Sequence, residues 1–166
     1  MKNLGTCFLL LLLAGGFPAR SVAQQDSADA ARRKAEQAGA ELQLKADQAS
    51  GASCAKLSLR AARHAMDDAD RLFLSGNMQA AHDAVGVSVR YARRAVECTL
   101  ESRKYQKRAE IELRGLIRRM NELVRTLDSE ERPQLTHAIA ELEQERDRLL
   151  QAIFGAQAAR PREQER

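Results

Sequence analysis

Tryptophan is absent from this 166-residue chain, aromatic residues make up only 4% of it, and there are three prolines and nine glycines. Strands favour β-branched and aromatic residues, so the shortage excludes a large β-sheet core. The low proline and glycine content excludes collagen-like and low-complexity chains, and three cysteines are too few for a disulfide-dense fold. Hydrophobic residues nevertheless reach 44% and charged residues 30%. Much of the apolar share is alanine, which favours an all-α fold.

The N-terminal residues have the pattern of a secretory signal peptide. Lys2 gives a positive start, an apolar run rich in leucine occupies residues 8–13, and small residues precede Gln24. The run is far shorter than the ~20 residues that span a bilayer, so we expect no transmembrane anchor. The sequence therefore predicts a signal peptide over residues 1–23, cleavage between Ala23 and Gln24, and an exported protein in the periplasm or outside the cell.

Cleavage at this position changes the charge of the chain. It removes two basic residues and no acidic one, which leaves 25 basic and 23 acidic residues and lowers the net charge from +4 to +2. A balance so close to neutral lacks the strong positive field of nucleic-acid-binding domains. We therefore expect no nucleic-acid partner.

Apolar residues recur at every third or fourth position along most of the chain, which is the period of a helix. The spacing predicts helices over residues 27–50, 54–75 and 78–127, and a last helix that begins near Pro133 and stops at Gly155. The third helix would contain about 50 residues and be about 75 Å long.

These helices define the predicted fold class. It is all-α: an elongated set of antiparallel helical hairpins with coiled-coil packing and about four helices. The helical domain covers residues 24–154, and residues 155–166 form a disordered charged tail.

The last two predicted helices carry leucine-rich stripes that fit one antiparallel register. Facing positions in an antiparallel hairpin have residue numbers with a constant sum, and five apolar pairs here have the sum 262. The outermost pairs are Leu127 with Leu135 and Ala109 with Ile153. The predicted coiled-coil seam comprises Leu113, Leu116, Met120, Leu123, Leu127, Leu135, Ile139, Leu142, Leu149 and Ile153.

Two cysteines remain after removal of the signal peptide. Cys54 and Cys98 each lie 22 residues from Gly76, the predicted turn between the second and third helices. The two thiols should therefore lie at the same height, and an exported protein would join them in a disulfide. A closed loop of about 45 residues contributes about 4 kcal/mol in the chain-entropy model. Two free thiols or a bridge between molecules are the alternatives.

No motif indicates catalysis, a metal or a cofactor. The chain lacks a His-Glu-x-x-His zinc motif, a Gly-x-Ser-x-Gly nucleophile motif and a glycine-rich phosphate loop. We expect His64, His82 and His137 to be solvated on helix surfaces, and Tyr91 and Tyr105 to pack in the seam. The sequence therefore predicts a protein that is not an enzyme, with no cofactor and no metal site.

A basic run in the third predicted helix indicates a second kind of partner. We expect a weak contact with an anionic envelope polymer or anionic lipid, made by Arg90, Arg93, Arg94, Lys104, Lys107 and Arg108. A solvated charged face is the alternative interpretation of the same residues.

Two short segments resemble known families. Residues 72–81, Leu-Phe-Leu-Ser-Gly-Asn-Met-Gln-Ala-Ala, resemble the turn of a tetratricopeptide hairpin, which implies one helical hairpin and no peptide-binding array. Residues 127–135, Leu-Asp-Ser-Glu-Glu-Arg-Pro-Gln-Leu, are similar to turns of the Spy-like periplasmic chaperones.

The sequence thus predicts an exported, non-enzymatic helical scaffold of the cell envelope that binds another protein or itself through exposed helix faces. The alternative, implied by the second resemblance, is a Spy-like periplasmic chaperone or stress protein that binds unfolded clients.

Overall fold

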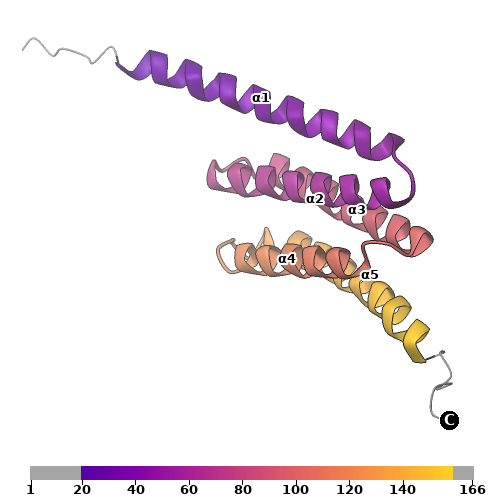
Figure 1. Ribbon diagram of the computed structural model, residues 1–166. Helices are drawn as coiled ribbons and strands as arrows, with labels where there is room; N and C mark the ends of the chain where they lie inside the picture. The colour runs from indigo at the N-terminus through magenta and orange to yellow at the C-terminus, as the bar shows by residue number, and fades with distance from the viewer. Residues whose placement is uncertain (1–19, 159–166) are drawn as a thin grey trace, which may run out of the picture. The chain divides into compact units, whose positions relative to one another are not determined.

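The computed structural model describes residues 20–158 of the chain, with side chains described within residues 30–155. This part contains five helices and no strand, which confirms the all-α prediction. The helices are α1 (Arg20–Gln48), α2 (Gly51–Leu74), α3 (Met78–Ser102), α4 (Gln106–Val124) and α5 (Arg132–Ala158) (Figure 1). None of the five has an apolar stretch long enough to cross a membrane. The chain divides into two compact units, Met1–Ala35 and Glu36–Arg166.

Both predicted terminal segments extend beyond the described residues. Residues 1–19 of the signal peptide and residues 159–166 of the tail lie outside them, and the predicted cleavage position after Ala23 lies in the first turn of α1. The predicted helix end at Gly155 is wrong, because α5 continues to Ala158. A single glycine costs a helix only about 1 kcal/mol, and the alanine and glutamine residues that follow it are good helix formers.

The α2–α3 hairpin is built from small side chains around a glycine turn. Gly76 adopts a φ of 76°, which ends α2, and the Asn77 side chain accepts a hydrogen bond from the Ala80 N–H to begin α3. Ser88 Oγ donates to the carbonyl of Ala62 across the helix pair at 2.9 Å. Such a bond needs close helix approach, which small residues permit. The fully or almost fully buried alanines of this hairpin are Ala55, Ala61, Ala62, Ala65, Ala69, Ala81, Ala92 and Ala95.

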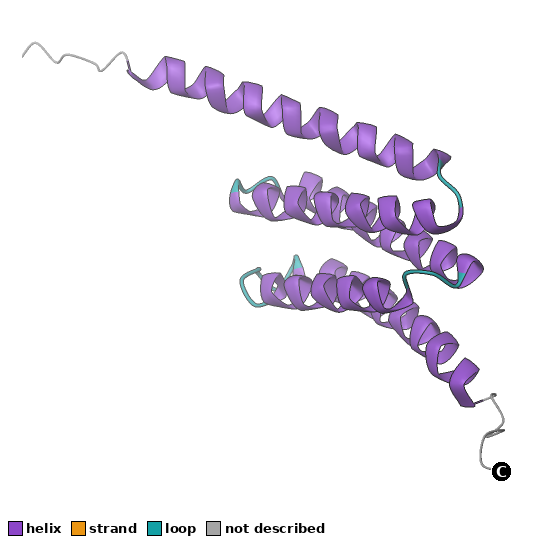
Figure 2. Cartoon of the chain, viewed as in Figure 1, coloured by secondary structure: helices purple, strands orange, loops and turns teal. Residues whose placement is uncertain are grey.

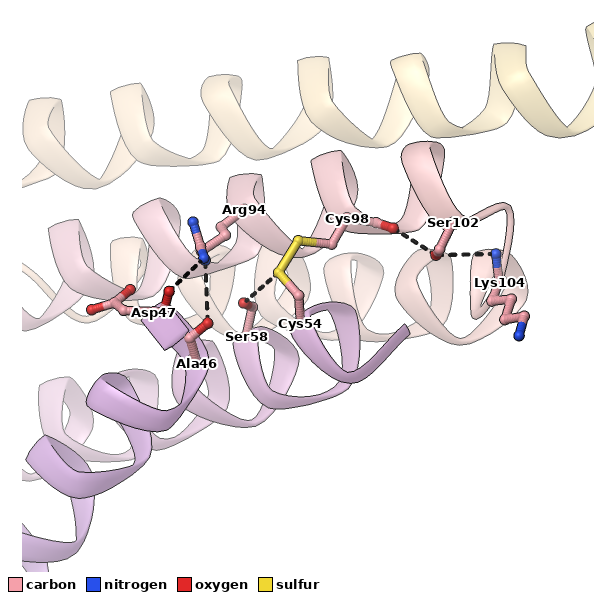
Figure 3. Close-up of a disulfide and its surroundings, with 8 residues drawn as sticks. All are labelled: Ala46, Asp47, Cys54, Ser58, Arg94, Cys98, Ser102 and Lys104. Carbon is pink, nitrogen blue, oxygen red and sulfur yellow. Dashed lines mark hydrogen bonds between the residues drawn. A yellow bond between two sulfur atoms is a disulfide. The ribbon is translucent and has the colours of Figure 1, made fainter. Parts of the chain in front are cut away.

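A disulfide closes the open end of this hairpin. It joins Cys54 in the first turn of α2 to Cys98 in the last two turns of α3, as the sequence predicted, with the two Cα atoms 5.9 Å apart (Figure 3). Beside it, Arg94 donates to the carbonyls of Ala46 at 3.4 Å and Asp47 at 3.0 Å. These are terminal carbonyls of α1, so a cation satisfies them where the helix dipole is negative.

The prediction of one helix over residues 78–127 is wrong. α3 ends at Ser102, a short loop follows, and α4 begins at Gln106 (Figure 2). Arg103 and Tyr105 both adopt left-handed backbone conformations, with φ of 54° and 63°. Such a conformation interrupts the pattern of hydrogen bonds that a helix needs, and it costs a residue with a Cβ about 1–2 kcal/mol. Within residues 20–158 the chain therefore has one helix more than predicted and no helix of 50 residues.

Ser102 supplies local hydrogen bonds at this break. Its hydroxyl donates to the Cys98 carbonyl at 2.6 Å and accepts from the Lys104 N–H at 3.4 Å. Side chains of this type compete with the helical backbone for hydrogen bonds and so favour helix ends.

The break lets two hairpins, α2–α3 and α4–α5, pack against each other with alternate helices parallel. Arg63 of α2 pairs with Glu112 of α4, and Arg119 of α4 pairs with Asp70 of α2; both pairs are 49 residues apart in sequence. A constant difference in residue number is the mark of parallel helices, just as a constant sum marks antiparallel ones. In the same way Arg93 of α3 pairs with Glu141 of α5, 48 residues further on.

The interior of this stack contains the residues of the predicted seam. Eight of the ten are buried, and Leu123 and Ile153 are partly buried and pack on the same apolar clusters. Both members of each predicted pair belong to one cluster, whereas the pairing itself stays a prediction. One cluster joins α2 and α3 to α4 and α5, so the two hairpins share a core.

The prediction that all three histidines are solvated is wrong for His82. Its side chain is 4% exposed, its ring meets the edge of Phe73 with centroids 5.4 Å apart, and Nε2 is hydrogen-bonded to Glu131. Glu131 lies in the turn before α5, so this contact ties the start of α3 to the second hairpin. His137 is exposed, and His64 is partly exposed with Asp68 3.1 Å away.

Tyr91 is the largest fully buried side chain of the described residues, and its hydroxyl donates to Asp47 Oδ2 at 2.9 Å. Burial, together with the hydrogen bond and negative charge of Asp47, raises the pKa of Tyr91 above its ordinary value. The folded state therefore holds the phenolic proton more tightly than the unfolded state does. This contribution to stability is complete below the unfolded tyrosine pKa of about 10 and is lost as the pH rises above it.

We expect Tyr91→Phe to lower the free energy of unfolding by about 1 kcal/mol at pH 8, the usual contribution of one hydrogen bond. The difference between the wild-type protein and the variant should shrink as the pH rises above 10, because only the wild type loses the stabilisation of Tyr91. Urea unfolding with the disulfide intact measures this. A difference that stays constant up to pH 11.5 would contradict the assignment.

Arg103→Gly tests the helix break. Glycine adopts a left-handed backbone without a Cβ clash, so the variant should gain about 0.5–1 kcal/mol in the free energy of unfolding, while Arg103→Ala should change little. A continuous helix predicts the opposite sign, because glycine in a helix interior loses about 1 kcal/mol. Thermal or urea unfolding of the two variants distinguishes the two cases.

Candidate functional site

Helices α2 and α4 lie side by side in parallel (Figure 1), and two recesses between them together form what we call the α2–α4 groove. Its α2 wall carries a stripe of polar residues at helical spacing, and its α4 wall begins at the break before α4 and carries a matching stripe. The two recesses follow each other along it, of about 600 and 450 Å³. The residues that line this α2–α4 groove are Lys56, Leu59, Arg60, Arg63, Asp70, Tyr105, Arg108, Glu112, Gly115, Arg118, Arg119, Glu122, Leu123 and Thr126.

The larger recess is strongly basic. We call it the basic cleft, and its lining residues are Lys56, Leu59, Arg60, Arg63, Tyr105, Arg108 and Glu112. Four of these carry a positive charge and one carries a negative charge. Tyr105 was predicted to pack in the seam, which is wrong: its side chain is 42% exposed at the rim. The left-handed backbone at this residue places it outside the helical stripe that the prediction assumed.

Glu112 links the two walls of the basic cleft. Its carboxylate is 3.5 Å from Arg63 Nη1 on α2 and 2.8 Å from Arg108 Nη2 on α4, and its side chain is only 14% exposed. One partly buried carboxylate therefore orients two guanidinium groups, one on each helix. Each guanidinium carries five N–H donors, so both have donors to spare for an incoming acceptor.

At the smaller recess, Arg119 joins α4 to α2. This side chain donates from Nε to Asp70 at 2.6 Å and from Nη1 to Asp67 at 2.5 Å. Burial on its own would lower the pKa of Arg119, but the hydrogen bonds and negative charges of Asp67 and Asp70 outweigh burial and raise it. Within the described residues, the second oxygen of Asp70, Oδ1, is buried without a hydrogen-bond partner.

Of the six basic residues singled out in the sequence, Arg90, Arg93 and Arg94 line one recess of about 240 Å³, separate from the basic cleft and shared with Asp47, Tyr91 and Glu97. Arg90 lies over the ring of Tyr91, Arg93 pairs with Glu141 and Glu145, and Arg94 caps α1. Lys104 and Lys107 are exposed beside the break, and among the six only Arg108 lines the basic cleft.

Sequence reasoning missed three residues of the basic cleft on α2: Lys56, Arg60 and Arg63. Their spacing of four and three was the available signal, because it places all three on one helix face. The opposing stripe on α4 comes to face them only because the chain changes direction at Arg103 and Tyr105, which the spacing does not show.

The described residues include no group of three or more histidine, cysteine, aspartate or glutamate side chains placed to hold a metal ion. Comparison of the chain with protein-family models, with curated proteins and with solved structures finds no match in any of the three.

Proposed function

We propose that the chain is an exported, non-enzymatic helical scaffold that binds a protein partner in the α2–α4 groove. Removal of the signal peptide after Ala23 and coiled-coil packing of α4 against α5 belong to the same proposal. The observation that carries it is the groove itself, two recesses in succession between parallel helices. Concave sites between helices are common places for a ligand or a partner segment to bind.

The walls of the groove are fixed by contacts within the protein, which supports this role. The disulfide fixes the first turn of α2 to α3, and Arg119 and Glu112 each bridge α2 and α4. A site whose walls are already in place loses less conformational freedom when a partner binds.

The chaperone alternative has less support. A surface for unfolded clients needs a contiguous apolar patch. Among the side chains that the structure describes, the exposed large apolar ones other than Tyr105 are Leu44, Leu74, Ile111 and Phe154, which lie on four different helices. The walls of the groove are mostly charged, so they suit a partner with a defined charge pattern better than an unfolded chain.

Site-specific photo-crosslinking in the cells that produce the protein tests the scaffold. A photoreactive residue at Arg60 or Glu122 in the groove should give one dominant protein adduct. The same residue at Gln144 or Gln151, both exposed on α5, should not. Equal adducts from all four positions, or none from the groove, would overturn the proposal. Suppression of the aggregation of a reduced model client at near-stoichiometric amounts would favour the chaperone instead.

A further inference from the structure

The charge of the basic cleft is largely unbalanced. Glu112 is its one acidic residue and is shared by Arg63 and Arg108. Lys56 and Arg60 are exposed, and neither takes part in an ion pair with any residue that the structure describes. The cleft therefore has an excess of about three positive charges, in a concave surface that strengthens their combined field.

The first turn of α4 adds neutral donors to the same place. Tyr105 is the N-cap of α4, and its side chain makes no capping hydrogen bond, so the first N–H groups of the helix lack a side-chain acceptor. Helix N-termini of this kind attract carboxylates and other anions. Tyr105 and Arg108 both line the cleft, so this helix end lies at its rim.

The concave shape of the cleft favours the carboxylates of a bound protein segment over a planar anionic lipid surface. A planar lipid surface contacts convex, exposed basic faces, whereas this cleft is a recess between two helices with Leu59 at 5% exposure in its lining. Single side chains of a bound segment can enter such a recess. Glu112 provides an internal example, because a carboxylate already lies between a guanidinium of α2 and one of α4.

We infer that the basic cleft binds an acidic segment of a protein partner, with Asp or Glu carboxylates accepting from Lys56, Arg60 and the spare donors of Arg63 and Arg108. The inference rests on the proposed function of the α2–α4 groove and adds the chemistry of the partner. Charge complementarity between a concave basic site and an acidic segment also speeds association and makes it sensitive to salt.

The test uses the intact chain without its signal peptide and a fluorescent 12-residue peptide of alternating Glu and Ala, followed by fluorescence anisotropy. The matched control peptide carries Gln in place of each Glu. The Glu peptide should bind, and its affinity should fall with rising salt, while the Gln peptide should bind at least about tenfold more weakly, as expected for lost charge-assisted hydrogen bonds.

Two double variants place the binding in the cleft. Lys56→Gln with Arg60→Gln should weaken binding at least about fivefold, because both side chains point to the cleft without an internal partner. Arg125→Gln with Arg148→Gln removes the same net charge from exposed positions outside the groove, one at the C-terminal cap of α4 and one on α5, and should change affinity less than about twofold. Circular dichroism melting checks that both variants fold.

Three results would overturn the inference. The first is equal binding of the Glu and Gln peptides, and the second is equal loss in the two double variants. The third is tighter binding to vesicles containing phosphatidylglycerol than to the Glu peptide, when that vesicle binding is lost in the Lys56→Gln, Arg60→Gln variant. Such a result would assign the cleft to lipid.

The two proposals can fail separately. If the Glu peptide does not bind while groove crosslinks still form, the inference of an acidic partner is wrong and the scaffold proposal stands. If the Glu peptide binds and no crosslink forms in the groove, the scaffold proposal is wrong while the binding of acidic segments stands.

Discussion

The architecture depends on the interruption of one helix at Arg103 and Tyr105. With a continuous helix from residue 78 to 127, the leucine-rich segment would extend beyond the α2–α3 hairpin and pack only on the last helix. Two left-handed residues instead redirect the chain, so that α4 lies beside α2 and α5 beside α3. The groove, its two recesses and the ion pairs across it all follow from this change of direction. Backbone strain of this kind persists only where the surrounding contacts fix it.

Those surrounding contacts differ between the two hairpins. The α2–α3 hairpin packs mainly through alanine and buried serine, which bury little apolar area per residue, and a disulfide closes its open end. The α4–α5 hairpin packs through leucine, isoleucine and methionine. Between the hairpins, Arg119, Arg93 and His82 make polar contacts to acidic residues of the other hairpin, around a shared apolar core. A chain with few aromatic residues thus obtains a defined core from close approach, a covalent link and specific polar pairs.

Much of this fold could be predicted from residue spacing. The stripes, the Gly76 turn, the disulfide and the apolar set that α4 and α5 bury depend on local periodicity, which a sequence carries directly. The break could not be found in the same way, because neither glycine nor proline marks it. The sign that the sequence offers is an extra step of four in the apolar stripe, from Ala109 to Leu113. The basic cleft was missed for a related reason: Arg60 and Arg108, which are far apart in sequence, converge only through tertiary packing.

One distance tests whether α4 runs parallel to α2 and beside it. Spin labels carried by non-cysteine residues at Leu74 and Glu122, both exposed, leave the native disulfide intact. Neighbouring helix axes lie about 10 Å apart. With the length of two labels added, the parallel arrangement predicts a distribution of label-to-label distances centred below about 30 Å in double electron–electron resonance. A continuous third helix would separate the labels by about 65 Å, and a distance distribution centred there would contradict the parallel arrangement of α2 and α4.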